Sequence, residues 1–247
     1  MLGRILLGAL VLLVLAAAIG WFALRRGDIP YETLEARYAV PTSHYVDLPS
    51  GIRAHYRDDG PADAPVVLLV HGFGDSFLSW ADWIEVLSRD FRVITVDVPG
   101  HGLTRAPADY APSGEAFVAF IDEFTTTINV PRFAIAGNSM GGGLAWRTTV
   151  EHAERVTALV LLNAAGFANE NQEPPSLAFK LLSTPFGRFL LENIETRPLT
   201  GASLRGNFVD ASVVTDEFVT RWVDVQRAPG HRHILMNILG GGAAPDT

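Results

Sequence analysis

The chain has 247 residues, enough for one large α/β domain with a buried core and a small appendage. Its formal net charge of −8 and the lack of a basic stripe exclude a nucleic-acid partner. The absence of cysteine excludes a thiol nucleophile, a zinc knuckle and disulfide bonds, and the seven histidines lack metal-ligand spacing. We therefore expect neither a metal nor a cofactor.

Residues 5–24 form an apolar segment without a charged side chain, bounded by Arg4 and Arg25. A helix of this length spans roughly 30 Å, the thickness of one hydrocarbon core. We predict a membrane anchor over residues 1–26, in a single-pass protein of a bacterial inner membrane. Basic residues flank both ends of the segment, so the side of the membrane that holds the domain stays open.

Two other interpretations of this segment also stay open. Residues 16–18 are three alanines that resemble a signal-peptide cleavage site, and a buried helix has a similar composition. The anchor is favoured because the apolar stretch continues through Trp21 and Phe22. Aromatic side chains at that position suit the boundary between membrane and water.

Residues 27–43 contain two prolines, and we expect a linker there, followed by the core at residues 44–167. The core begins with strand-like runs at 44–48 and 52–57, joined by a Pro-Ser-Gly turn. Residues 66–70 are a continuous apolar run, typical of a strand that is buried on both faces.

Helical and strand patterns then alternate regularly along the chain. The expected helices and strands lie at residues 80–88, 92–96, 113–128, 132–136, 140–151 and 156–163. This alternation predicts a doubly wound, mostly parallel sheet with helices on both faces. Ligands of such sheets bind beyond the carboxyl ends of the strands, where the distinctive loops of this chain fall.

Residues 137–141 read Gly-Asn-Ser-Met-Gly and follow an expected strand directly. This is the G-x-S-x-G pattern of a tight strand-to-helix turn that exposes a nucleophilic serine. Ser139 is therefore the predicted nucleophile. The backbone N–H of Met140, at the helix start, is aimed at a developing oxyanion, and Asn138 is expected beside the substrate.

Residues 71–74 read His-Gly-Phe-Gly and follow the first buried strand. Glycine lets the backbone approach a substrate carbonyl, so we expect the Phe73 N–H to be the second oxyanion donor, with Gly72 beside the substrate. His71 is expected to fix this loop through hydrogen bonds. Asp97 and His101, in the loop after the next strand, resemble a catalytic pair but are also expected to be structural, because triad partners follow the serine in this motif.

After Gly166 the alternation stops, and prolines separate short apolar helical patterns around residues 177–182, 186–191 and 218–225. We predict a helical cap over residues 168–235 and the start of an incomplete C-terminal core at 236–247.

Together, the serine turn, the His-Gly-Phe-Gly loop and the Asp-x-Pro-Gly-His-Gly loop resemble the α/β-hydrolase fold family. Within it they resemble the cap-bearing lipase and esterase branch, which includes membrane-anchored enzymes similar to monoacylglycerol lipase. The resemblance implies Ser139 as nucleophile, the N–H groups of Phe73 and Met140 as oxyanion hole, and a cap that shapes the pocket. Haloalkane dehalogenases and epoxide hydrolases of this fold carry an aspartate in place of Ser139.

The family places its acid and its histidine on strands that follow the cap, and this sequence ends before either. We therefore expect a truncated chain, with both residues beyond position 247. One alternative stays open, because Asp210, Asp216 and Asp224 precede His231 and His233 in a permitted order.

The predicted function is a serine hydrolase that cleaves carboxylic esters, lipid-like or with small acyl groups, through an acyl-enzyme. The predicted partners are a small-molecule ester or lipid substrate and the membrane, which is contacted by residues 5–24. Two alternatives remain: a carbon–carbon bond hydrolase of the same fold, or a non-catalytic, membrane-tethered binding module with a decayed hydrolase site.

Overall fold

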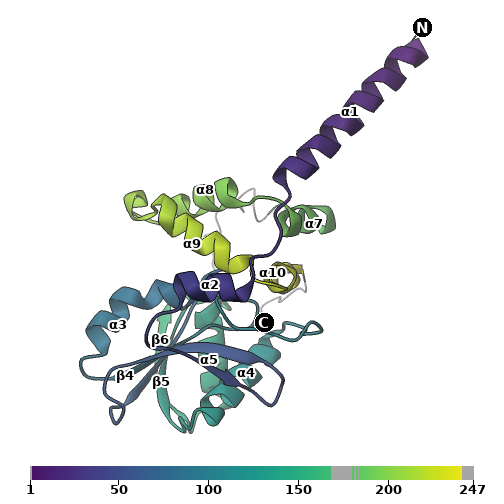
Figure 1. The fold of residues 1–247 in the computed structure, drawn as a ribbon. Helices are drawn as coiled ribbons and strands as arrows, with labels where there is room; N and C mark the ends of the chain where they lie inside the picture. The colour runs from purple at the N-terminus through teal and green to yellow at the C-terminus, as the bar shows by residue number, and fades with distance from the viewer. Residues whose placement is uncertain (1, 168–179, 181, 183, 241–247) are drawn as a thin grey trace.

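The computed structural model describes residues 2–167, 180, 182 and 184–240. Figure 1 shows a long N-terminal helix, α1 (Leu2–Leu24), that projects away from a domain built on a twisted sheet. A group of short helices lies between α1 and the sheet. Its members are α7 (Pro185–Asn193), α8 (Arg197–Asn207), α9 (Asp216–Gln226) and α10 (His231–Gly240).

The sheet contains six strands in the order β1-β2-β4-β3-β5-β6 among the residues described. Their bounds are β1 (Ser43–Asp47), β2 (Arg53–Asp59), β3 (Val66–Val70), β4 (Arg92–Val96), β5 (Phe133–Asn138) and β6 (Val156–Leu162). β1 and β2 form an antiparallel hairpin, β2 pairs antiparallel with β4, and the remaining pairs are parallel. The expected mostly parallel sheet is confirmed.

Helices cover both faces of the sheet, as a doubly wound fold requires. α4 (Gly114–Thr127) and α5 (Met140–Glu151) pack on the face that carries Leu68 and Val70. α3 (Ala81–Leu87), preceded by the short 3-10 helix η1 (Phe77–Trp80), packs on the opposite face against Leu69. Successive side chains of β3 thus enter different cores, which explains its continuous apolar sequence.

The segment 27–43, which we expected to be a linker, instead contains a packed helix, α2 (Tyr31–Tyr38). Leu34 is completely buried there against Phe77 and Leu103, two residues of the core. Pro30 precedes the helix at a φ of −54°, which suits a helix start. The chain therefore joins the domain soon after α1 ends.

The part of the predicted cap that the structure describes is largely helical, and most of the apolar pattern at 177–182 lies outside the described residues. The start of the C-terminal core was expected at residues 236–247, and residues 236–240 form part of α10. Ile238 of this helix packs against the larger core cluster. α10 spans both sides of the expected boundary at residues 235 and 236, so no break in the chain separates cap from core there.

Candidate active site

Ser139 is the N-cap residue of α5, in the turn that follows β5. Its φ of 50° and ψ of −116° lie in a region that residues other than glycine rarely adopt. The Ser139 N–H donates to the carbonyl of Leu162 at 3.0 Å, and the Ser139 carbonyl accepts from the Ala165 N–H at 2.9 Å. The end of β6 therefore holds the strained turn in place, and such strain is concentrated at functional sites.

Two glycines make the turn sterically possible. A Cβ at Gly137 would lie 2.1 Å from the carbonyl oxygen of Gly141. A Cβ at Gly141 would lie 2.2 Å from the carbonyl oxygen of Val70, at the end of β3. Helix α5 thus starts in direct contact with the sheet, which places Ser139 at the carboxyl end of a central strand.

Ser139 lines a pocket of about 1150 Å³ between the sheet and the cap. Gly72, Phe73 and Asn138 line the same pocket, so four of the five predicted site residues lie together. Met140 is the first residue of α5, and its N–H stands at the helix N-terminus next to Ser139. Neither the Phe73 nor the Met140 N–H has an acceptor among the described residues.

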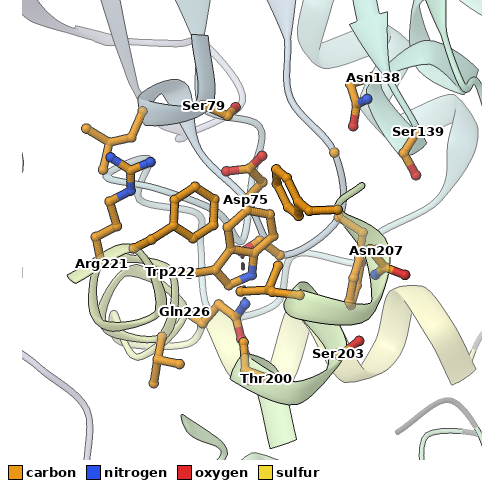
Figure 2. Close-up of a pocket in the computed structure, with 18 of the residues that line it drawn as sticks. Asp75, Ser79, Asn138, Ser139, Thr200, Ser203, Asn207, Arg221, Trp222 and Gln226 are labelled. Carbon is orange, nitrogen blue, oxygen red and sulfur yellow. Dashed lines mark hydrogen bonds between the residues drawn. The ribbon is translucent and has the colours of Figure 1, made fainter. Parts of the chain in front are cut away.

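Cap helix α9 forms the other side of the pocket and supports the loop at residues 71–74. Figure 2 shows Ser139 at one side of the pocket and Arg221 at the other, with Trp222 between them. The Gln226 side-chain amide donates to the carbonyl of Gly74 at 2.9 Å. Gln226 was not predicted from the sequence, because it lies 152 positions from Gly74 and no local motif marks it. The one available signal was helical spacing, which places residues 222 and 226 on one face of α9.

His71 also holds this loop in place through hydrogen bonds, as expected. Its Nδ1 donates to the carbonyl of Gly72 at 2.8 Å, and its Nε2 accepts from the N–H of Val98 at 3.2 Å. Burial lowers the pKa of His71, so the ring is neutral and both nitrogens are used. It is therefore not placed to take a proton from Ser139.

Asp97 is a buried structural anchor, but its histidine partner is His55 and not His101. The His55 Nδ1 lies 2.7 Å from Asp97 Oδ2, and the other carboxyl oxygen accepts from the Phe77 N–H at 2.7 Å. Burial opposes ionisation of Asp97, but the hydrogen bonds from His55 and from the Leu103 N–H outweigh it and lower the pKa. His55 comes from β2, and no local motif marked it.

Asp75 is a carboxyl of the pocket whose pKa is raised. It lies two residues after Phe73, and its Oδ1 accepts from the Ser76 N–H at 2.7 Å. Burial raises the pKa of Asp75 to about 7, against the lowering effects of that hydrogen bond and of Arg221. The pocket therefore contains a group that titrates near neutral pH.

No histidine lines the pocket among the residues that the structure describes. The Nδ1 of His101 lies 3.2 Å from the Pro99 carbonyl. His231 is buried, with ring nitrogens 2.9 Å from the carbonyls of Val225 and Thr104. His233 lies against Glu192 on the surface of the cap.

The three candidate acids do not form a triad with these histidines. Asp224 is buried and accepts a hydrogen bond from the Tyr38 hydroxyl at 2.9 Å, which ties α9 to α2. Asp216 pairs with Arg205 at 3.2 Å. Asp210 lines the pocket, and its carboxylate accepts from the N–H of Ser212. The alternative in which His231 or His233 is the catalytic base is not supported by these contacts.

Over the described part of the chain, no group of three or more His, Asp or Glu side chains is arranged to hold a metal ion.

The fold agrees with what the comparisons with known proteins found. A family model for the alpha/beta hydrolase fold matches residues 65–221, which is more than half of the chain. This protein belongs to the alpha/beta hydrolase fold family.

Three similar proteins show the range of the family. The 2-hydroxy-6-oxo-2,4-heptadienoate hydrolase of Pseudomonas putida is 37% identical over 126 residues, 50% of this chain and 45% of that protein. Epoxide hydrolase 3 of Xenopus tropicalis is 33% identical over 118 residues, 47% of this chain and 32% of that protein. The crystal structure of a membrane phospholipase A matches with a TM-score of 0.63 and 24% identity.

The phospholipase match covers 95% of this chain and 74% of that chain, and at this identity it shows the fold alone. The chain matches less than half the length of each of the two curated relatives named above.

Proposed function

We propose that this chain carries the nucleophile and the oxyanion hole of a serine hydrolase that cleaves carboxylic esters through an acyl-enzyme. The observation that carries the proposal is the conformation of Ser139, held at positive φ at the start of α5 and lining a large pocket. An aspartate nucleophile would attack through a carboxylate and needs no base for the first step. A serine hydroxyl must lose its proton as it attacks.

In the proposed first step, Ser139 Oγ bonds to the ester carbonyl carbon while its proton passes to a base. The carbonyl oxygen becomes an oxyanion, which the N–H groups of Phe73 and Met140 stabilise; one such donor contributes about 3–4 kcal/mol to lowering the barrier. The C–O bond to the alcohol then breaks, and the base returns the proton to the departing alkoxide. Water hydrolyses the acyl-enzyme by the same steps.

The base and its acid partner are proposed to lie outside residues 1–247, because none of the described histidines lines the Ser139 pocket. Without a base, acylation slows by several orders of magnitude. We therefore expect the 247-residue chain to react with a fluorophosphonate probe slowly and only at Ser139.

Labelling kinetics of the chain and of its Ser139→Ala variant measure this, with an intact serine hydrolase as the rate standard. Reaction as fast as that standard would show that the chain contains a base. Equal labelling of the alanine variant would exclude Ser139 as the nucleophile. Complete absence of labelling would favour the non-catalytic binding module.

Cleavage of a carbon–carbon bond is a second candidate, since the heptadienoate hydrolase is 37% identical over half of this chain. Both reactions need a serine turn and an oxyanion hole, so these features do not separate them. The substrate preference of the pocket is therefore the property to measure. An enzyme form that includes the base is expected to hydrolyse p-nitrophenyl esters of graded acyl length faster than a vinylogous diketone. The reverse preference would favour the carbon–carbon hydrolase.

The membrane anchor is also part of the proposal. α1 contains one helical segment, Gly3–Leu24, that is long and apolar enough to cross a bilayer, and none of it is buried. A signal sequence passes the same test. We favour the anchor because Trp21, near the end of α1, is packed against the cap.

A further inference from the structure

Cap helix α7 lies directly beside the end of α1 that faces the domain (Figure 1). The rings of Trp21 and Phe189 are stacked, with centroids 5.4 Å apart and planes 3° from parallel. The Glu195 N–H donates to the carbonyl of Leu24 at 2.8 Å, and the Glu195 carboxylate pairs with Arg26 at 3.2 Å. Side-chain and backbone contacts together fix α7 against this end of α1.

These contacts also fix the depth of α7 relative to a membrane. The uncharged part of α1 ends at Leu24 and is followed by Arg25 and Arg26. If α1 spans a bilayer, as the proposed function holds, Trp21 lies at the boundary between the acyl chains and the headgroups. A ring stacked on Trp21 must lie at the same depth, so Phe189 reaches that boundary too.

The two faces of α7 have different surroundings. Phe186, Phe189 and Leu190 share one face, with Phe186 69% and Phe189 51% exposed. On the opposite face Gly187 and Leu191 are buried, and Leu191 lines the Ser139 pocket. α7 thus separates the pocket from an apolar surface that stays largely exposed, although the Trp21 ring is stacked on Phe189.

The residues next to this apolar face are an exposed aromatic residue and a basic residue, as is typical of a surface that lies in a membrane interface. Phe22, adjacent to the stacked Trp21, is 77% exposed. Arg25, one turn further along, is exposed and lies where anionic phosphate groups of a bilayer would be. Exposed aromatic rings backed by basic side chains are the composition of helices that lie in the membrane interface.

We propose that α7 is a second membrane contact of this protein. Its Phe186–Phe189 face enters the headgroup and acyl boundary of a phospholipid bilayer beside α1, and its Leu191 face forms a wall of the Ser139 pocket. The occupant of the exposed face is the lipid surface. This inference rests on the proposed membrane span, which supplies the depth reference.

The lack of cysteine allows this to be tested by labelling single sites in the full chain. Phe186→Cys carries an environment-sensitive NBD fluorophore, and the protein is reconstituted in vesicles of phosphatidylcholine and phosphatidylglycerol. Leu12→Cys, in the middle of α1, is the reference for the membrane interior. Val150→Cys, 73% exposed on α5, is the matched control for a surface site away from α1.

Quenching by lipids with a shallow or a deep doxyl group, and by aqueous iodide, then reports the position of each label. We expect the label at 186 to be quenched by shallow doxyl lipid at least threefold more than the label at 150. We also expect iodide to quench the label at 186 at least threefold less than the label at 150. The label at 12 should be quenched best by deep doxyl lipid.

The outcomes separate the inference from the proposed anchor. A label at 186 that is as accessible to iodide as the label at 150, with the label at 12 deep in lipid, would overturn the α7 contact and leave the anchor intact. Protection of 186 from both iodide and lipid would overturn it in favour of a protein partner, such as a second copy of the chain. A label at 12 that lipid does not quench would overturn the anchor and the α7 contact with it.

Discussion

Two aspartates near the loop at residues 71–74 show how strongly the surroundings of a single residue decide its chemistry. Asp97 accepts hydrogen bonds from His55 and two backbone N–H groups, and its pKa is lowered despite burial. Asp75 has a single backbone donor, Ser76, and burial raises its pKa to about 7. One carboxyl is a fixed ion that supports the loop, and the other gains or loses a proton near neutral pH.

The raised pKa of Asp75 predicts that replacing it with asparagine stabilises the protein more at alkaline pH. Between about pH 4 and 7 the unfolded chain releases this proton while the folded chain keeps it, so stability falls as pH rises through this window. The amide of the asparagine variant would not titrate. We expect the advantage of Asp75→Asn over the wild type to grow by roughly 1–3 kcal/mol from pH 4 to pH 8. Urea unfolding in detergent at both pH values measures it.

The control is Asp82→Asn, which removes a carboxylate that lines the same pocket from α3. The Asp82→Asn measurement gives the effect of removing one carboxyl group from the pocket, against which the pH dependence of Asp75→Asn is compared. An advantage of Asp75→Asn that did not change with pH would contradict the assignment of a near-neutral pKa to Asp75.

At the scale of elements, two adjacent strands of the sheet were predicted with the bounds that the structure has. Residues 66–70 and 92–96 are β3 and β4 without any shift. A strand that is buried on both faces needs mostly apolar residues at consecutive positions, and this pattern can be recognised within a few residues of sequence. By contrast, α2 was missed, because one buried leucine in eight residues gives no helical period and its packing partners lie far along the chain.

At the junction of β3, β5 and α5, we expect the addition of a single methyl group to destabilise the fold strongly. In Gly141→Ala the new Cβ would meet the Val70 carbonyl oxygen at 2.2 Å, and backbone has little room to move. We expect a loss of about 3 kcal/mol or more in the free energy of unfolding. Thermal or urea unfolding of the purified variant measures this loss.

Gly206→Ala is the matched control, because a Cβ at this position of α8 has no neighbour within 4 Å. It should stabilise the protein by about 0.5–1 kcal/mol, since alanine favours helix. Similar losses in the two variants would show that helix propensity, and not the contact with β3, governs Gly141.

At the scale of the whole molecule, the described residues expose one apolar surface at strand β6 of the sheet and another on α7, beside the end of α1. β6 pairs with β5 alone among the described strands, and Leu159, Val160 and Leu161 are exposed on it. Consecutive residues of a strand point to opposite faces, so both faces of β6 lack cover. An edge strand of this kind is a template for pairing with another chain.

We therefore expect the 247-residue chain to self-associate in detergent, and Val160→Lys to reduce the associated fraction several-fold. A lysine at an edge opposes strand pairing through charge. Size-exclusion chromatography with light scattering gives the protein mass in the micelle. Val86→Lys, at an exposed position of α3, should leave association unchanged, and an unchanged mass for Val160→Lys would show that α1 or another surface drives it.

The sequence alone determined the apolar span, the alternation of strands and helices, and the serine turn with its glycines. Each depends on residues that are close in the chain, where side-chain period and backbone sterics act directly. The tertiary structure decided the pairing of Asp97 with His55, the support of Gly74 by Gln226, and the stacking of Phe189 on Trp21. These contacts join segments that are 42, 152 and 168 positions apart, and only packing of the whole chain brings such segments together.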